Sequence, residues 1–218
     1  MKKYFFMLAL LIIATNAHAE GNVALGARIS SLGVGPEVSL GLSDDLTVRG
    51  AAHWGSYSVD GDTDDIEYDC DLNLASGLAT VEWNIFADGF HVDAGILFNG
   101  NNIDASAKAT NGTVTVNDVD YNAGQVGTIK GEIDFKPVVP YLGLGWGNPV
   151  GADRTWTFFC NLGVVFQGSP DVSLSADGVL GANATFMRNL QQEERELQED
   201  MDAFEYYPVI ALGLTYKF

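Results

Sequence analysis

Hydrophobic and polar residues alternate with a period of two along much of the chain, most plainly in its last residues, ALGLTYKF. Counted back from the end in steps of two, one face carries large apolar side chains, and the other carries small or polar ones. The apolar face consists of Phe218, Tyr216, Leu214, Leu212 and Ile210. A period of two is typical of a β-strand whose two faces meet different surroundings.

The same alternation recurs in eight segments, which predicts an all-β fold with an even number of strands. In chain order these are NVALGARISSL, VGPEVSLGLS, LTVRGAAHWGSY, YDCDLNLASGLATVEW, FHVDAGILF, VVPYLGLGW, WTFFCNLGVVFQ and the C-terminal segment. The fourth segment changes phase near Ala75, which predicts a β-bulge at that point.

The connections between these segments alternate in length. SDD, FADG and NPVGADR are short turns, whereas the connections after the third, fifth and seventh segments are long and polar. Short turns on one rim and long loops on the other are typical of outer-membrane barrels. Four tryptophans near strand ends fit an aromatic belt at the membrane interface, namely Trp54, Trp83, Trp146 and Trp156. The sequence predicts an eight-stranded antiparallel transmembrane β-barrel with long extracellular loops; a soluble periplasmic sandwich or lipocalin-like barrel is the alternative.

The N-terminus has the three parts of a secretory signal peptide. Lys2 and Lys3 precede an apolar run, and small residues follow at Ala17 and Ala19. We expect residues 1–19 to be the signal peptide and residues 20–218 to be the barrel domain. The apolar run is too short to cross a bilayer as a helix, which takes about 20 residues. The predicted location is the outer membrane of a Gram-negative bacterium.

Charge and cysteine content narrow the range of partners. The formal net charge is −18, and removal of residues 1–19 leaves nine basic against 29 acidic residues, or −20. So acidic a chain is not expected to bind nucleic acid. Cys70 and Cys160 form no disulfide framework, and we expect both to be reduced or isolated, with Cys160 as a small buried hydrophobe.

Charged residues on the polar face of the strands are the candidates to line the lumen. They are Arg28, Glu37, Arg49, His53, Glu82, His91, Asp93 and Lys217. Charges of both signs on neighbouring strands should pair, because an unpaired ion in a narrow interior is costly. Eight strands leave little interior space. The lumen is therefore either a packed polar plug or a narrow, gated path.

One segment after the third strand is strongly acidic and is expected to be an extracellular loop. Its acids include Asp60, Asp62, Asp64, Asp65 and Glu67. The spacing at its start suggests calcium, but the glycine and glutamate of an EF-hand loop are missing, so a solvated surface loop is the better interpretation. No metal or cofactor is predicted. The negative charge would concentrate cations near the mouth of a lumen.

The last long connection contains FMRNLQQEERELQEDMDAF, in which apolar residues recur at helical spacing. The stripe is formed by Phe186, Leu190, Leu197, Met201 and Phe204. Such a helix would lie across the barrel mouth or form a loosely ordered excursion, because so narrow a stripe buries little area.

Several segments together resemble the CarO-type outer-membrane channels. These are LGAR near the start, VVPYLGLGW, TWTFFCNLGVVFQGSPDVSL, the acidic helical insertion and EYYPVIALGLTYKF, which ends in Phe instead of the Trp associated with that family. The resemblance implies an eight-stranded barrel, passage of small basic amino acids such as ornithine, and an influence on carbapenem susceptibility. Tyr216 and the terminal Phe218 also resemble the C-terminal signal that the barrel-assembly machinery reads. Outer-membrane lipid and lipopolysaccharide are then the expected surroundings.

Three classes of function compete. A narrow channel for small, preferentially cationic solutes is the main hypothesis, and a non-conducting structural or adhesin-like barrel acting through its acidic loops is the alternative. An enzyme would need a nucleophile, a base and an orienting acid within reach. His53 with Ser56 or Ser58, and His91 with Asp93, are more simply lumen or loop residues, so no catalytic residue is predicted.

Overall fold

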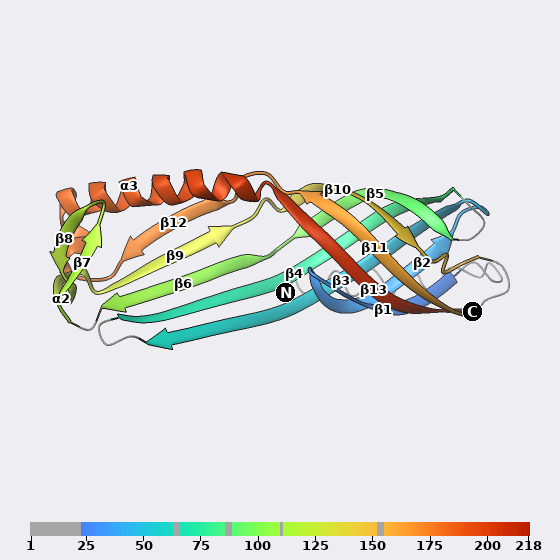
Figure 1. Ribbon diagram of the computed structural model, residues 1–218, viewed down its shortest axis with the longest axis horizontal. Helices are drawn as coiled ribbons and strands as arrows, with labels where there is room; N and C mark the ends of the chain where they lie inside the picture. Colours follow the sequence, from blue (N-terminus) through green and yellow to red (C-terminus); the bar gives the residue numbers. More distant parts are fainter. Residues whose placement is uncertain (1–22, 63–65, 86–88, 110, 152–154) are drawn as a thin grey trace.

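The computed structural model describes residues 23–62, 66–85, 89–109, 111–151 and 155–218. The expected signal peptide lies outside them. Eight antiparallel strands form a closed ring in which β1 pairs with both β2 and β13 (Figure 1). The ring strands are β1 (Val23–Ser30), β2 (Gly33–Gly41), β3 (Leu46–Asp62), β4 (Ile66–Asn84), β5 (Phe90–Asn99), β10 (Val138–Trp146), β11 (Trp156–Phe166) and β13 (Tyr206–Lys217). The eight predicted strands are confirmed.

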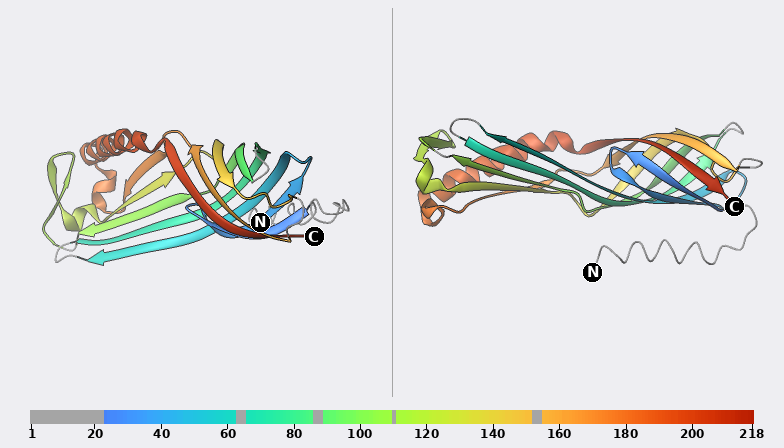
Figure 2. Two further views of the ribbon diagram at one scale, coloured as in Figure 1. Left: turned by 45° about the vertical axis from the view of Figure 1, so that its right-hand side comes forward. Right: turned by 90° about the horizontal axis from the view of Figure 1, so that it is seen from below.

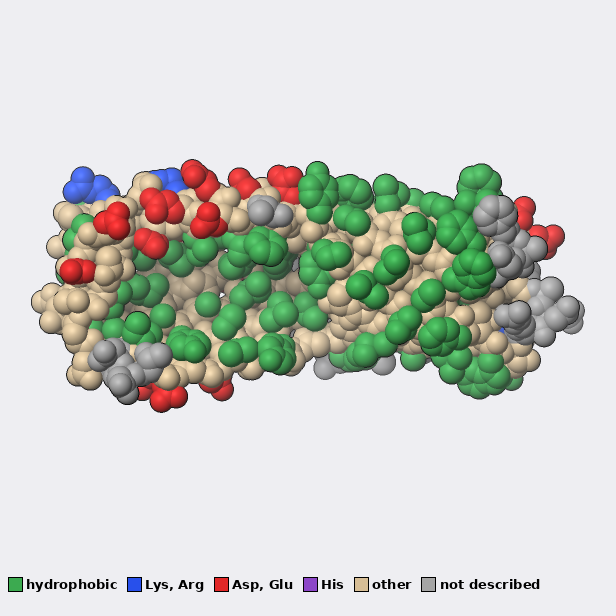
Figure 3. Space-filling view, in the orientation of Figure 1, with side chains coloured by type: hydrophobic (Ala, Val, Ile, Leu, Met, Phe, Trp, Pro, Cys, Tyr) green, Lys and Arg blue, Asp and Glu red, His purple; other side chains and the backbone are tan. Residues whose placement is uncertain are grey.

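The outer wall of the ring is apolar. Large side chains that point away from the barrel axis are well exposed, as in Leu162 (55%), Ile210 (59%) and Leu142 (52%). Aromatic rings gather at the rim of the short turns, where Trp156 packs edge-on against Tyr216 with ring centroids 4.9 Å apart. Apolar side chains cover the barrel half of the face seen in Figure 3. An apolar exterior on a closed barrel is the arrangement that a lipid environment requires.

Strands β3 and β4 continue past the rim that lies opposite the short turns, and separate strands connected to β5, β10 and β11 lie beside them. They form a curved sheet, here called the extension, while β13, β1 and β2 end at that rim (Figure 2). The extension contains residues 55–62 of β3, residues 66–74 of β4, β6 (Asn102–Ala109), β9 (Thr128–Asp134) and β12 (Asp171–Ala176). The connections expected to be long loops are therefore mostly strands, and Asp60, Asp62 and Glu67 lie in a β-hairpin.

The predicted β-bulge near Ala75 is wrong. Strands β3 and β4 pair in one unbroken register from Leu46 opposite Trp83 to Asp62 opposite Glu67. The phase change in the sequence is instead an exchange of polarity between the two faces. In the barrel the inward face of β4 carries Glu82, whereas in the extension the same face carries Tyr68.

Helix α3 (Ala184–Met201) closes one side of the extension. Asn183 caps its start, because the side-chain oxygen accepts hydrogen bonds from the amides of Thr185 and Phe186. Glu194 and Gln198 accept hydrogen bonds from backbone amides of β12, at 2.8 and 3.0 Å, and so satisfy the free edge of the sheet. The predicted helix is confirmed, but it runs along the extension beside β12 and not across the barrel mouth (Figure 1).

The far end of the extension has its own small core. Phe186 and Leu190 of α3 pack with Val116 and Val126, and Tyr121 meets the ring of Phe186 edge-on at 5.0 Å. This end is built from a hairpin and short helices: β7 (Thr113–Val116), β8 (Val119–Asn122), α2 (Ala123–Val126) and η1 (Val179–Ala182). The other short helix, η2 (Asp202–Phe204), follows α3 at the barrel end, where the carbonyl oxygen of Phe204 accepts a hydrogen bond from Gln167. The core anchors the helix at the end farthest from the barrel.

Between α3 and β4 the extension is hollowed into an apolar groove. Its volume is about 310 Å³, and its lining includes Tyr68, Ile129, Ile133, Leu174 and Leu197. Figure 3 shows apolar side chains in this hollow and acidic side chains along its helical margin. The opposite face of the sheet is polar and carries Asp69, Asp71, Asp104 and Glu132.

Candidate functional site in the barrel lumen

A network of buried charges fills the part of the lumen nearer the short turns. Arg49 is central, because its Nε lies 3.3 Å from Glu37 Oε1 and 3.0 Å from Glu82 Oε1. Arg28 approaches the other oxygen of Glu37 at 3.4 Å. None of these four side chains is more than 3% exposed. Buried ions of this kind are tolerated only when they are paired. Each carboxylate of the network therefore depends on an arginine for its stability, and each arginine on a carboxylate.

Phe159 supports the two arginines from the opposite wall. The guanidinium carbons of Arg49 and Arg28 lie 4.6 and 5.4 Å from the centre of its fully buried ring. The ring leans across Gly213, its cross-strand neighbour on β13, and a Cβ on that glycine would collide with it. Cation–π contact thus adds to the ion pairs and holds both arginines in the lumen.

Asn161 links the arginine to a histidine and thereby determines which ring nitrogen of that histidine is protonated. Its Oδ1 accepts a hydrogen bond from Arg49 Nη1 at 3.1 Å, so its amide nitrogen must face His91 Nε2, 2.9 Å away. The Nδ1 atom of His91 lies 3.3 Å from the carbonyl oxygen of Gly89, to which it can donate. His91 is therefore neutral, with the lone pair of Nε2 directed into the lumen.

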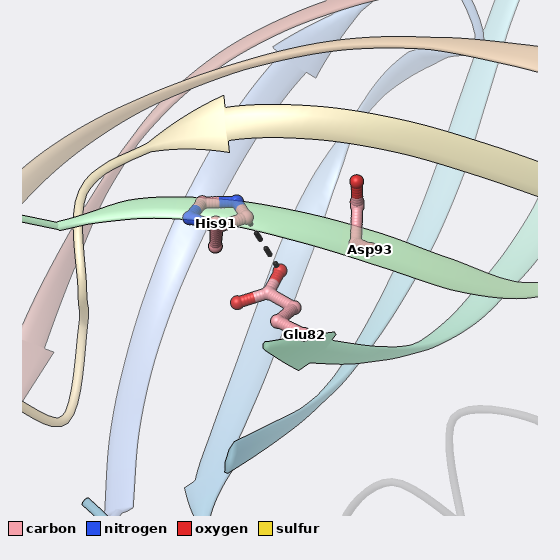
Figure 4. Close-up of side chains that lie close together, drawn as sticks. All are labelled: Glu82, His91 and Asp93. Carbon is pink, nitrogen blue, oxygen red and sulfur yellow. Dashed lines mark ion pairs between the residues drawn. The ribbon is translucent and has the colours of Figure 1, made fainter. Parts of the chain in front are cut away.

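Two carboxylates face this histidine. Glu82 of β4 and Asp93 of β5 are direct cross-strand partners on the inward face, and both are buried. Figure 4 shows Glu82 and His91 converging, with Asp93 beside them on the same strand as His91; Nε2 lies 3.9 Å from Glu82 Oε1. Like charges directly opposite one another destabilise a sheet. Arg49 compensates Glu82, whereas no Arg or Lys of the described residues lies within 4.0 Å of Asp93.

An apolar layer lies in the lumen on the side of the extension. Leu32 from the β1–β2 turn packs with Leu78, Leu97, Val139 and Val165, and each is at most 4% exposed. Tyr141 and Val209 complete the layer. Two layers of side chains therefore fill the lumen. The charged network lies near the short turns, and the hydrophobic layer lies at the opposite end.

Tyr141 connects the two layers. The side chain is 1% exposed, and its ring leans across Gly163 on the neighbouring strand and its hydroxyl across Gly143. A Cβ at either glycine would collide with Tyr141. Small residues on the wall thus make room for one large side chain that lies over two neighbouring strands.

The candidate lumen residues lie in three places. Arg28, Glu37, Arg49, Glu82, His91 and Asp93 meet in the charged network. His53 is buried but lies beside Ser76, with 3.4 Å between its Nδ1 and the hydroxyl oxygen. Lys217 remains at the short-turn rim, where its Nζ donates to the carbonyl oxygen of Gly151 at 2.9 Å. It does not reach the network.

The other predicted residues lie on the outside. Asp60, Asp62 and Glu67 are on the polar face of the extension, and Asp64 and Asp65 lie outside the described residues. Tyr216 and Phe218 pack edge-on against each other at 5.1 Å, and Phe218 is 66% exposed. Both cysteines are free, but Cys160 points outward and is exposed; the expectation that it is buried is wrong.

Sequence reasoning missed three residues of the site, Phe159, Asn161 and Tyr141. Each lies on the inward face of its strand, and each has a glycine close by on the neighbouring strand: Gly213, Gly145 and Gly163. An inward large side chain next to an inward glycine is the signal that could have found them. It becomes readable only when the strand register is known.

The hypothetical catalytic groupings are separated. His53 faces the lumen, whereas Ser58 lies on the opposite face of β3 and contacts Asp71. His91 and Asp93 share a face, but they lie within the charged network and have no serine among their contacts in the described residues. No helix in the described part of the chain is long and apolar enough to cross a membrane.

Comparison with solved structures identifies the fold. Acinetobacter baumannii CarO2 aligns with a TM-score of 0.61 and 22% sequence identity over 90% of this chain and 98% of its own. A CarO structure from the same organism gives 0.58, again at 22% identity over the same shares of both chains. The chain has the fold of the CarO barrels. The resemblance seen in the sequence is thus confirmed at the level of the fold.

More distant structural matches and the sequence comparisons give no further information about the fold. A major outer membrane protein from Thermus thermophilus covers 92% of the chain at 13% identity, with a TM-score of only 0.45. No protein-family model and no curated protein sequence matches the chain. Together with the apolar outer wall, the fold makes this an outer-membrane type of β-barrel.

Proposed function

We propose that the protein conducts small, preferentially cationic solutes across the outer membrane through a narrow, gated lumen. The observation that carries this proposal is the charge of the inner wall. Three buried carboxyl groups, Glu37, Glu82 and Asp93, face two guanidinium groups, Arg28 and Arg49, so the acids of the lumen outnumber its arginines by one. A negative interior of low dielectric favours cations over anions.

The extension supports the same preference. With the short turns and both termini in the periplasm, the extension projects from the cell and carries Asp69, Asp71, Asp104 and Glu132 on one face. Such a surface raises the local concentration of cations within about a Debye length, near 8 to 10 Å at physiological salt. The resemblance to CarO-type channels adds basic amino acids as the solutes to test.

Two layers of buried side chains fill the lumen, so conduction requires a gate. Tyr141 and Phe159 are suited to this role, because each is a large inward side chain that lies over glycines of the wall, Tyr141 over Gly143 and Gly163 and Phe159 over Gly213. Rotation of these two rings about their side-chain torsions would open the hydrophobic layer at Tyr141 and release the two arginines from Phe159. Tyr141→Ala and Phe159→Ala should therefore raise single-channel conductance, and Phe98→Ala, on the outward face, is the matched control.

Reversal potentials in planar bilayers test the selectivity. Under a salt gradient the protein should show preference for K⁺ over Cl⁻, and Asp93→Asn should reduce it. Liposomes that contain the protein should admit ornithine and lysine faster than glutamate. Equal permeability to both ions, or glutamate uptake equal to that of ornithine, would contradict the selectivity while leaving a channel.

A second function is favoured by the closure of the lumen itself. Two filled layers are the structure expected of a barrel that only anchors its extension, whose groove and acidic face would then bind something outside the cell. Absence of conductance in the wild-type protein and in both aromatic variants would favour this non-conducting barrel. No catalytic step belongs to either proposal.

Assembly is proposed to depend on the exposed C-terminal aromatic. Phe218 lies on the outer, apolar side next to Tyr216, where another protein can reach it before the barrel enters the membrane. Deletion of Phe218 should slow membrane insertion by purified barrel-assembly machinery more than it slows spontaneous refolding in detergent. Equal slowing would argue against a recognition signal.

A further inference from the structure

The triad Glu82, His91 and Asp93 has the composition and geometry of a metal site. We propose that it binds one divalent transition-metal ion of the zinc class inside the barrel. One donor atom from each residue, His91 nitrogen and two carboxylate oxygens, lies within 4.8 Å of the others, and all three residues are at most 2% exposed. Imidazole and carboxylate together are a ligand set that suits zinc and its neighbours in the first transition row.

The tautomer and orientation of His91 suit metal binding. Arg49 determines the orientation of Asn161, and the Gly89 carbonyl takes the Nδ1 proton, so Nε2 of His91 keeps its lone pair on the side of the carboxylates. A neutral imidazole whose second nitrogen donates to a backbone carbonyl is the usual arrangement of a metal-bound histidine.

The carboxylates need a further positive charge. With His91 neutral, the network has two arginines against three acids, and Asp93 has no Arg or Lys of the described residues within 4.0 Å. Glu82 Oε2 accepts no hydrogen bond from the described protein atoms, although Arg49 holds its other oxygen. A bound cation would satisfy this oxygen and compensate Asp93 in one place.

The NH₂ group of Asn161 occupies the position that the ion would take. It approaches His91 Nε2 at 2.9 Å and Asp93 Oδ2 at 3.5 Å, and it must turn aside when the ion binds. Donor atoms of a tetrahedral zinc site lie about 3.3 Å apart, so donor atoms up to 4.8 Å apart have to approach by as much as about 1.5 Å. Since Glu82 and Asp93 are cross-strand neighbours, side-chain torsions suffice for this contraction.

Two glycines border the triad. A Cβ on Gly145 would lie 2.6 Å from His91 Nε2, and a Cβ on Gly143 would lie 2.5 Å from Asp93 Oδ1. Gly145→Ala therefore obstructs the site without removing a ligand. Three protein ligands would leave a fourth position open toward the lumen, as in zinc sites that exchange a bound water.

Metal binding is tested on the refolded, tag-free full-length barrel in detergent micelles. Cys70→Ser and Cys160→Ser form the background, because free thiols bind zinc. Zn²⁺ affinity and stoichiometry are measured by competition with a fluorescent chelator, and Co²⁺ absorption reports the ligand geometry. One ion per chain is expected, with an affinity at least about 10-fold lower in His91→Ala and Asp93→Asn.

Matched variants distinguish this site from general attraction to an acidic protein. His53→Ala removes the other buried histidine, and Asp69→Asn with Asp71→Asn removes acids of the extension; all should bind as the background does. Gly145→Ala should bind more weakly although every ligand is present. Because an inward variant could fail to fold, each is first checked for the gel shift between unheated and boiled samples, and only folded variants are compared.

A second measurement applies even if a ligand variant does not fold. Saturating Zn²⁺ should raise the thermal unfolding temperature of the background protein and change the chemical shifts of the His91 ring. Less than one Zn²⁺ per folded chain, equal affinity in folded His91→Ala, or no change at the His91 ring would overturn the proposal. None of these readouts depends on conductance, so a failure of the channel proposal leaves the metal site to be judged separately.

Discussion

Strands β3 and β4 run through both the barrel and the extension, but the two regions expose opposite faces to their surroundings. Along β4 the inward face passes from Glu82 in the barrel to Tyr68 in the extension, while the outward face passes from Val81 to Asp69. The register does not change between them. In lipid the outside must be apolar and the narrow interior holds the polar groups, whereas in water the apolar face turns toward the helix and the groove. The solvent on each side of the rim therefore decides the polarity of a continuous strand.

The interiors of the two regions differ in what holds them together. The barrel interior depends on compensated charge and the extension on hydrophobic contact with α3, as at Phe186 and Leu190. Removing one partner of the buried ion pairs should lower the free energy of unfolding more than any other change considered below. Arg49→Met leaves Glu37 and Glu82 facing each other, and we expect a loss of about 3 to 5 kcal/mol in the free energy of unfolding. Urea titration in lipid vesicles measures this loss.

Lys130→Met is the matched control for that substitution. Lys130 also loses an ion pair, with Asp177 at 3.7 Å, but both partners are more than half exposed. Exposed pairs contribute little because water solvates the separated charges well. A cost for Arg49→Met no greater than that for Lys130→Met would mean that the buried network does not stabilise the barrel.

The outer faces of the two regions should respond differently to the same new charge. Leu162→Arg places a cation in the apolar wall of the barrel and should cost about 2 to 4 kcal/mol if the site is near the bilayer midplane. Glu67→Arg places it on the polar face of the extension and should change stability by less than about 0.5 kcal/mol. Unfolding titrations in vesicles give both values, and equal costs would contradict the exchange of polarity.

A substitution in the apolar groove of the extension should have a smaller effect on stability. Leu197 of α3 is half-buried over the apolar face of the extension, so Leu197→Ser should loosen the helix by about 1 kcal/mol. Hydrogen exchange of α3 amides measures this loosening, while amides of β11 should be unaffected. Faster exchange in both regions would show that barrel and extension unfold as one unit.

The smallest expected effect is a pH dependence confined to the extension. Asp177 Oδ1 accepts a hydrogen bond from the Thr128 amide at 2.7 Å, and this bond, with Lys130 nearby, holds the pKa of the Asp177 carboxyl below its usual value. A lowered pKa in the folded state means that the stabilisation is fully present above about pH 4 and disappears as the pH falls through the folded pKa.

Exchange of the Thr128 amide measures this dependence. After correction for intrinsic exchange, its protection should be lower at pH 3 than at pH 5, and Asp177→Asn should remove the difference. An Asp177→Asn variant that keeps the full pH dependence would assign it to another group.

The alternation of side chains was enough to predict eight strands, the outward face of every strand except the fourth, and the helix after β12. These features depend on periodicity, and a period of two or 3.6 can be read without knowing what a segment touches. The inward position of Arg28, Glu37, Arg49 and His91 followed from the same alternation. The phase change near Ala75 was also real, but the sequence could not show that solvent and not a bulge caused it.

The tertiary structure decided which of these residues meet. Glu82 faces Asp93 because β4 and β5 pair in one register, while Arg49 reaches Glu82 from β3 and Asn161 from the far side of the ring. Closure of the ring of strands sets these distances, and they cannot be predicted from the local sequence of any one strand. Lys217 has the inward phase but remains at the rim, since phase gives the face of a strand and only the stagger of the closed barrel gives the depth.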